Sequence, residues 1–197
     1  MTSPNVVWYQ GTPRERRWSA VGAAGATVWF TGRPASGKST LAAALEAALL
    51  DEGRSAYLLD GDNLRHGING NLGFDRAARR ENVRRTAHVA RLLADSGAVA
   101  LVSVVSPYAA DRKLARAIHA ADGLPFVEVH VATPLAECER RDPKGLYAKA
   151  RAGEIAGFTG VDSPYESPRN PDLEIVPDLP MEEHVEQLLG VLAGLES

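Results

Sequence analysis

Short apolar runs alternate with amphipathic stretches along most of the chain. The runs are rich in β-branched residues and predict strands at residues 27–31, 55–59, 99–105, 126–131 and 173–176. Between them, apolar residues recur with helical spacing, which predicts helices at residues 39–52, 75–96, 110–121, 134–140 and 181–195. This alternation favours the α/β class, with a mainly parallel sheet between two helical layers (α/β/α) and ligands at the carboxyl ends of the strands.

Two long stretches interrupt the alternation. Residues 61–74 contain four glycines, and residues 142–171 are rich in glycine, proline and charge. Because loops of this length usually carry function, we interpret both as mobile segments that close over ligands, and we call residues 142–171 the lid loop. The length of 197 residues predicts a single domain, in which residues 1–24 form an N-terminal extension.

A phosphate-binding motif follows the first predicted strand. Gly32 is followed by four residues and then by Gly37, Lys38 and Ser39, where a predicted helix begins. This is the pattern G-x-x-x-x-G-K-[ST] in the strand–loop–helix context that it requires, and it predicts a P-loop NTPase fold that uses ATP with Mg²⁺. Lys38 would reach the β- and γ-phosphates, and Ser39 would bind the metal ion. The expected nucleotide-binding residues of this motif are Gly32, Ser36, Gly37, Lys38, Ser39 and Thr40.

Two carboxylates, Asp60 and Asp62, follow the second predicted strand, at the sheet edge where the phosphate loop also lies. Asp60 is the better candidate for a general base, because it could accept the proton of an acceptor hydroxyl and help to hold Mg²⁺, directly or through water. The alternative is that both aspartates only cap the following turn. The third predicted strand lacks a terminal acid and is followed by Ser106 and Pro107. Ser106 could line the phosphoryl path, carry the phosphoryl group or simply form a turn.

Helical periodicity divides the arginines between residues 65 and 91 into two sets. Arg80, Arg84 and Arg91 fall away from the apolar stripe and are predicted to be surface charges. Arg79 and Asn82 share the inward stripe, where an unpaired cation is costly to bury, so an anionic ligand is the expected partner. Arg65 lies in the glycine-rich stretch before this helix and could supply a second cation.

Two phenylalanines, Phe74 and Phe158, lie in glycine-rich segments outside any periodic core pattern. A ring in such a position can stack on a base, although aromatic residues also anchor loops to a core.

Composition narrows the class of protein. The net charge of −3 gives no basic excess, which argues against a nucleic-acid partner. The beginning of the chain lacks a charged and then apolar signal, and no apolar stretch approaches the ~18 residues that span a bilayer, so we expect a cytoplasmic protein without a membrane partner. The one cysteine, Cys138, cannot form an internal disulfide and is expected to be a buried thiol.

Several blocks of the sequence resemble the adenylylsulfate (APS) kinases, which phosphorylate the 3′-hydroxyl of adenosine 5′-phosphosulfate to give PAPS in sulfate assimilation. The resemblance covers nearly the whole chain and is far more specific than the phosphate motif. Its blocks are residues 5–8, 27–32, 59–67, 72–74, 106–108, 141–147, 150–155 and 157–160.

This resemblance implies roles for residues that the motif does not reach. Arg65, Arg79 and Asn82 would hold the phosphosulfate and ribose of APS, and Phe74 and Phe158 would sandwich its adenine. Family kinship also implies a homodimer. The full set implied at APS is Asp60, Asp62, Arg65, Phe74, Arg79, Asn82, Ser106, Pro107, Lys144 and Phe158. Arg141 would stack on the adenine of ATP, and Ser106 stands where family descriptions place a phosphoserine, so the catalytic set is Asp60, Lys38 and Ser106.

The phosphate loop departs from the family pattern, which resembles G-L-S-G-S-G, by having Pro34 and Ala35. Because proline lacks an N–H and alanine resists positive φ, we expect an altered cradle. Three hypotheses follow: an APS kinase with direct in-line transfer, a P-loop kinase for another small hydroxyl acceptor, and a nucleotide-binding regulator without turnover.

Overall fold

The computed structural model describes residues 5–7, 9 and 11–195. Trp8, which belongs to the first block of family resemblance, and the residues at the start of the chain that lack a signal, 1–4, lie outside the described residues. None of the helices in the described part is long and apolar enough to cross a membrane.

A parallel sheet forms the centre of the molecule, with strands in the order β2-β3-β1-β4-β5. All four strand pairings among the described residues are parallel. The strands are β1 (Ala26–Thr31), β2 (Ala56–Asp60), β3 (Val99–Ser103), β4 (Phe126–Val131) and β5 (Leu173–Ile175). The predicted α/β class and parallel sheet are therefore confirmed.

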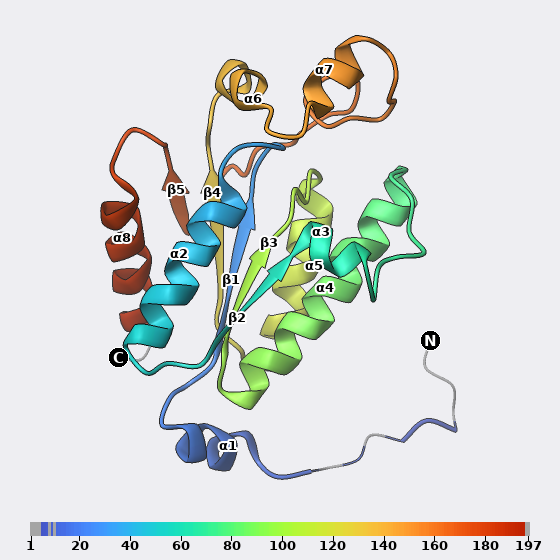
Figure 1. Cartoon of the computed structure of the whole chain (residues 1–197). Helices are drawn as coiled ribbons and strands as arrows, with labels where there is room; N and C mark the ends of the chain where they lie inside the picture. Colours follow the sequence, from blue (N-terminus) through green and yellow to red (C-terminus); the bar gives the residue numbers. More distant parts are fainter. Residues whose placement is uncertain (1–4, 8, 10, 196–197) are drawn as a thin grey trace.

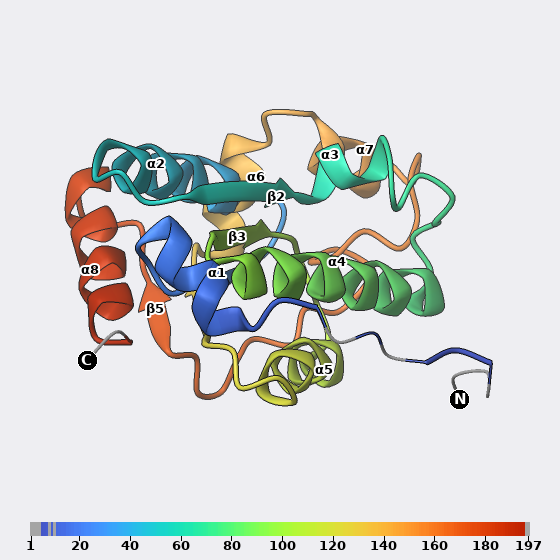
Figure 2. The same cartoon turned by 90° about the horizontal axis from the view of Figure 1, so that it is seen from below.

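Helices cover both faces of the sheet, as expected (Figures 1 and 2). On one face α2 (Lys38–Asp51) and α8 (Met181–Ala193) pack against each other, and on the other face α4 (Arg76–Ser96) packs against α5 (Ala109–Ala120). Each layer buries its own apolar cluster, with Leu45 of α2 in one and Val83 of α4 in the other. These two clusters hold the strands rigidly, so the loops at their carboxyl ends start from fixed positions.

Three short helices lie near the carboxyl ends of the strands (Figure 1). They are α3 (Gly61–Arg65), α6 (Leu135–Arg141) and α7 (Leu146–Arg151). The sequence analysis placed no helix in residues 61–74 or 142–171, but α3 lies in the first stretch and α7 in the second. Local side chains explain both helices: Asp60 accepts from the N–H groups of α3, and Asp142 accepts from Tyr147 N and Ala148 N at the start of α7.

Packing against α4 explains one further helix, α1 (Arg14–Val21), which the sequence analysis left within the N-terminal extension. The Trp18 indole donates to Ala94 O, and Arg14 and Arg17 pair with Asp95. The hydrophobic pattern of residues 14–21 is weak, and it does not reveal these partners on α4, which stabilise the helix.

Two smaller predictions about side chains and strand ends were wrong. Arg91 is not a surface charge, because its side chain is largely buried and pairs with Asp122, whereas Arg80 and Arg84 are exposed as predicted. Strand β3 ends at Ser103 rather than at residue 105, because the chain soon turns through Ser106, whose φ is 38°.

Candidate active site

A cavity of about 880 Å³ opens where the chain leaves β1, β2 and β3, and residues of the lid loop line it as well. Its walls come from the phosphate loop, α3, the start of α4, the turn after β3 and the lid loop. Among the described residues, every predicted site residue lines this cavity except Gly32 and Ser36. Those lining it are Gly37, Lys38, Ser39, Thr40, Asp60, Asp62, Arg65, Phe74, Arg79, Asn82, Ser106, Pro107, Arg141, Lys144 and Phe158.

The phosphate loop leads from β1 into α2. A Cβ at Gly32 would lie 2.7 Å from both Ser36 Oγ and Val131 O, so only glycine fits there, and Gly37 has a φ of 100°. Ser36 is buried behind the loop, where its carbonyl accepts from Thr133 Oγ1 at 2.7 Å. Ala35 adopts a φ of 59°, so the loop keeps a left-handed residue there despite the side chain. That conformation is strained for alanine, and the surrounding bonds must hold it.

Lys38 is buried beneath the loop with a relative exposure of 7%. Its Nζ donates to Arg33 O at 2.7 Å and lies 3.4 Å from Ser36 Oγ. Burial lowers the pKa of the Lys38 ammonium to about 8, and attraction to neighbouring groups, among them the Asp60 carboxylate, opposes this only in part. The ammonium is therefore held at the loop, and it forms no ion pair among the described residues. A buried cation of this kind can bind an anionic ligand.

Ser39 and Asp60 meet at the sheet edge. Ser39 Oγ donates to Asp60 Oδ2 at 2.6 Å and lies 3.0 Å from Ser103 Oγ. The other carboxylate oxygen, Oδ1, accepts from the backbone N–H groups of Asp62 and Asn63 at 2.9 and 3.4 Å. The capping alternative for Asp60 is thus correct for one oxygen, while the second oxygen faces the phosphate loop. Hydroxyl and carboxylate oxygens of this kind are the donors that Mg²⁺ prefers, so the residues fit that ion.

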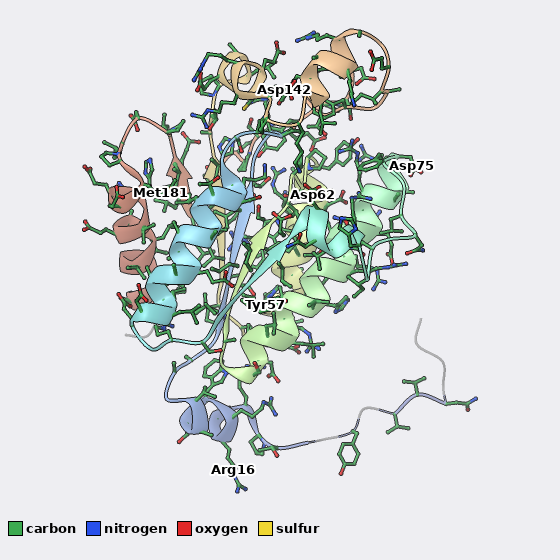
Figure 3. The ribbon with its side chains drawn as sticks, viewed as in Figure 1. Arg16, Tyr57, Asp62, Asp75, Asp142 and Met181 are labelled. Atoms are coloured by element: carbon green, nitrogen blue, oxygen red, sulfur yellow. The ribbon has the colours of Figure 1, made fainter. Side chains whose placement is uncertain are left out.

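Asp62 forms an ion pair with Lys144 of the lid loop rather than capping the turn. Both side chains are exposed, and the contact raises the pKa of Lys144. In Figure 3, Asp62 lies at the carboxyl end of β2, below the segment that carries Asp142. Arg141 Nη1 would lie 3.7 Å from a Cβ on Gly37, and its Nε donates to Glu137 Oε1 at 2.8 Å. Arg141, at the end of α6, and Lys144, on the lid loop, therefore place two cations near the phosphate loop and α3.

Arg79 and Asn82 face the cavity from α4, as the helical spacing predicted. Arg79 forms no ion pair among the described residues, but its guanidinium is hydrogen-bonded: it donates to Phe74 O at 2.7 Å, Thr159 Oγ1 at 2.8 Å and Gly157 O at 2.6 Å. None of these partners carries a charge, and burial lowers the pKa of Arg79. Asn82 is buried, and its Oδ1 has no hydrogen-bond partner among the described residues. An uncompensated cation beside an amide oxygen that lacks a donor is an arrangement that an anionic ligand with a hydroxyl or N–H donor would complete.

Arg65 and Phe74 form the outer wall of the cavity. The Arg65 guanidinium lies 4.1 Å from the centroid of the Phe74 ring and donates to Leu72 O at 2.9 Å. Burial and, after it, repulsion by Arg79 lower the pKa of Arg65. Phe74 is 62% exposed, so it is not core filler. Phe158, on the lid loop, is half-buried and packs edge-to-face on Tyr147.

Ser106 is 3% exposed at the turn after β3. Its hydroxyl donates to Thr31 Oγ1 at 2.9 Å and accepts from Trp29 Nε1 at 3.2 Å. The carbonyl of the same residue accepts from the buried Arg112 at 2.8 Å. The hydroxyl is thus engaged both as a donor and as an acceptor. This favours a role for Ser106 in shaping the cavity wall rather than in carrying a phosphoryl group.

Sequence reasoning missed three cavity residues that organise the lid loop, namely Tyr147, Thr159 and Asp142. Tyr147 and Thr159 act through contacts to segments far away in the chain, such as the bond of Thr159 to Arg79, whereas Asp142 accepts locally from Tyr147 N and Ala148 N. The only sequence signal was membership of the blocks that carry the family resemblance.

Known proteins resemble the chain over most of its length. The family described as "Adenylylsulphate kinase" matches residues 24–176. The "Adenylyl-sulfate kinase" of Aeromonas salmonicida is 51% identical over 190 residues, which cover 95% of this chain and 96% of the relative. The "Bifunctional enzyme CysN/CysC" of Mycobacterium tuberculosis is 58% identical over 168 residues, 85% of this chain, and the match spans only 27% of that longer protein.

One solved structure adds agreement in three dimensions. The Mycobacterium tuberculosis APS kinase CysC, in complex with AMPPNP and APS, superposes with a TM-score of 0.85 at 57% identity, covering 89% of this chain and 99% of that chain. The family match, the relatives and the shared fold agree with the resemblance drawn from the sequence blocks. The chain belongs to the adenylylsulphate kinase family.

Proposed function

We propose that the protein is an APS kinase, which transfers the γ-phosphoryl group of ATP to the 3′-hydroxyl of APS and releases PAPS and ADP. The observation that carries the proposal is the composition of one cavity. The phosphate loop with Lys38, the cationic and aromatic pair Arg65 and Phe74, and Asp60, which accepts from Ser39, all line this cavity. The relative that shares the fold was solved with AMPPNP and APS, which are ligands of these two kinds.

The residues divide the reaction between them. The phosphate loop and Lys38 bind the β- and γ-phosphates, and Arg141 lies over the nucleotide. Asp60 Oδ2 accepts the proton of the attacking hydroxyl while its Oδ1 stays fixed by the backbone of α3, so the base cannot rotate away. Transfer is direct and in line, without a phosphoserine, because the Ser106 hydroxyl is engaged with Thr31.

Ser39 and Asp60 would hold Mg²⁺ with ATP, Asp60 directly or through water. When bound there, Mg²⁺ would supply positive charge against the charge that develops on the phosphate oxygens.

The arrangement of the whole chain is also part of the proposal. We infer a single kinase domain over residues 1–197, in which residues 142–171 close over the substrates and the N-terminal extension, residues 1–24, contributes α1, which packs on α4. The homodimer and the cytoplasmic location stay predictions, and size-exclusion chromatography with light scattering tests the first.

The decisive experiment is an assay in which ADP release is coupled to NADH oxidation while APS is varied. An APS kinase forms PAPS and ADP in equal amounts, with ATP and Mg²⁺ both required. Turnover of a different hydroxyl acceptor without competition by APS would show the second hypothesis, and nucleotide binding without turnover of any acceptor would show the third.

Replacing Arg79 by alanine is expected to raise the KM for APS by about tenfold to hundredfold, because a charged donor that faces the acceptor is lost, and each such hydrogen bond contributes about 1.5–3 kcal/mol. The dissociation constant of ATP should stay within about twofold. Arg84→Ala is the matched control, because Arg84 lies on the same helix but is exposed and pairs with Glu81. A loss confined to ATP affinity in Arg79→Ala would contradict its place at the acceptor.

ATP binding is expected to take up protons above pH 8. Because burial sets the Lys38 pKa at about 8 in the nucleotide-free protein, only about a quarter of these side chains carry a proton at pH 8.5. Bound phosphates raise that pKa, so binding should take up about 0.7 proton at pH 8.5 and about 0.1 at pH 7. Titration calorimetry in buffers of different ionisation enthalpy measures this number. The prediction is wrong if proton uptake is the same at the two pH values.

A further inference from the structure

The lid helix α7 carries a buried tyrosine, Tyr147, which contacts both halves of the cavity. The side chain lines the cavity, yet the residue is only 2% exposed. Its hydroxyl donates to Pro34 O in the phosphate loop at 3.1 Å. Its ring packs against Phe158 with centroids 4.9 Å apart and planes at 82°, the favourable edge-to-face geometry. Among the described residues, no other side chain both hydrogen-bonds to the phosphate loop and packs on Phe74 or Phe158.

The contact with Pro34 fixes a particular peptide plane. Pro34 has no N–H, so its carbonyl is the one polar backbone group that it offers. In a trans peptide the N–H of the next residue points opposite to the carbonyl, so holding Pro34 O also sets the direction of the Ala35 N–H. Ala35 adopts the strained φ of 59° and lines the cavity, which means that something must hold its conformation. Tyr147 supplies that bond from the lid loop.

The position of Tyr147 is itself firmly set. Its backbone N–H donates to Asp142 Oδ1 at 3.1 Å, and the neighbouring Ala148 N–H donates to Asp142 Oδ2 at 3.0 Å. A Cβ on Gly160 would lie 3.8 Å from the Tyr147 hydroxyl, so the loop that follows Phe158 packs closely around it. A side chain that is held in this way transmits a shift of the phosphate loop to Phe158 instead of absorbing it.

We propose that Tyr147 is a positioning residue that couples the nucleotide half of the cavity to the acceptor half, so that phosphates bound at the loop favour the Phe158 position that binds the acceptor. This inference rests on the proposed function. Coupling between two ligands is reciprocal, so APS should tighten nucleotide binding by the same factor as the nucleotide tightens APS binding.

The test compares binding of APS with and without AMPPNP, measured by calorimetry on the full chain. In the parent protein AMPPNP should tighten APS binding by about fivefold or more, which is the usual range for coupled sites. Tyr147→Phe keeps the ring on Phe158 but loses the hydroxyl, so the factor should fall at least about twofold, the equivalent of one hydrogen bond. Tyr147→Leu, which loses both contacts, should bring the factor to about one while the nucleotide alone still binds.

Tyr57→Phe is the matched control, because Tyr57 is exposed on β2. Its coupling factor should equal that of the parent. A purely structural role would lower the melting temperature of Tyr147→Phe but leave the coupling factor unchanged, and that result would overturn the proposal. Absence of coupling in the parent would overturn it as well. Failure of the parent to bind or turn over APS would instead contradict the proposed function, so the two failures are distinguishable.

Discussion

Replacing Asp60 by asparagine is expected to lower kcat by about 10²- to 10⁴-fold, the usual contribution of a general base. Asparagine keeps an oxygen that can accept from the α3 backbone, as Asp60 Oδ1 does now at 2.9 Å from Asp62 N, so the local fold should persist. The lost function is that of Oδ2, which accepts from Ser39 and, in the proposed mechanism, takes the proton of the acceptor hydroxyl. Single-turnover kinetics at saturating ATP and APS measure the chemical step directly.

The control for this variant is Asp51→Asn, an exposed carboxylate at the end of α2 far from the cavity. Its kcat should match that of the parent. The melting temperature of Asp60→Asn should lie within a few degrees of the parent value, which separates lost chemistry from unfolding. A kcat within threefold of the parent would show that Asp60 only caps α3, the alternative that its sequence position left open.

The sheet and its helices were predictable because their signals are local and repeated. The apolar run at residues 126–131 predicted strand β4 with its observed bounds, Phe126–Val131. The stripe of apolar residues along α4 correctly predicted that Arg79 and Asn82 lie on the inward face of the helix. The phosphate loop was predictable for a different reason, because its backbone requires glycine at two positions. A side chain at Gly32 would clash with its neighbours, and Gly37 adopts a positive φ that other residues disfavour.

The lid loop was less predictable, because its order comes from contacts across the molecule. Arg79 illustrates the difficulty. Helical spacing shows that its side chain points inward, but not that it reaches Gly157 and Thr159, which lie 78 and 80 positions later. The same holds for Tyr147 and Pro34, which are joined through one hydrogen bond at a separation of 113 residues. Such contacts follow from how elements pack, and no periodicity in either segment encodes the partner.

Replacing Lys38 by methionine is expected to lower kcat/KM for ATP by about 10²- to 10³-fold, the effect of removing one donor aimed at charge that develops in a transition state. Methionine fills nearly the same buried volume, so the phosphate loop should keep its shape. Lys113→Met, an exposed lysine on α5, is the matched control and should leave kcat/KM unchanged.

Although Lys38→Met is expected to lower catalysis, it is expected to raise the melting temperature of the nucleotide-free protein. Burial holds the folded-state pKa of Lys38 at about 8, below its ordinary value, so the folded protein bears a cost for the charged ammonium at every pH below 8. As the pH rises from 8 towards 10.5, the unfolded chain binds more protons than the folded one, so the stability of the parent rises in that window. Lys38→Met lacks this dependence, and its advantage in melting temperature should shrink as the pH increases. A constant difference between the two proteins from pH 7 to 10 would mean that Lys38 is not held as a desolvated cation. If the difference in melting temperature shrinks as expected, burial of the charged Lys38 ammonium destabilises the nucleotide-free protein. The same buried charge prepares the loop for phosphate, because a bound anion would compensate it.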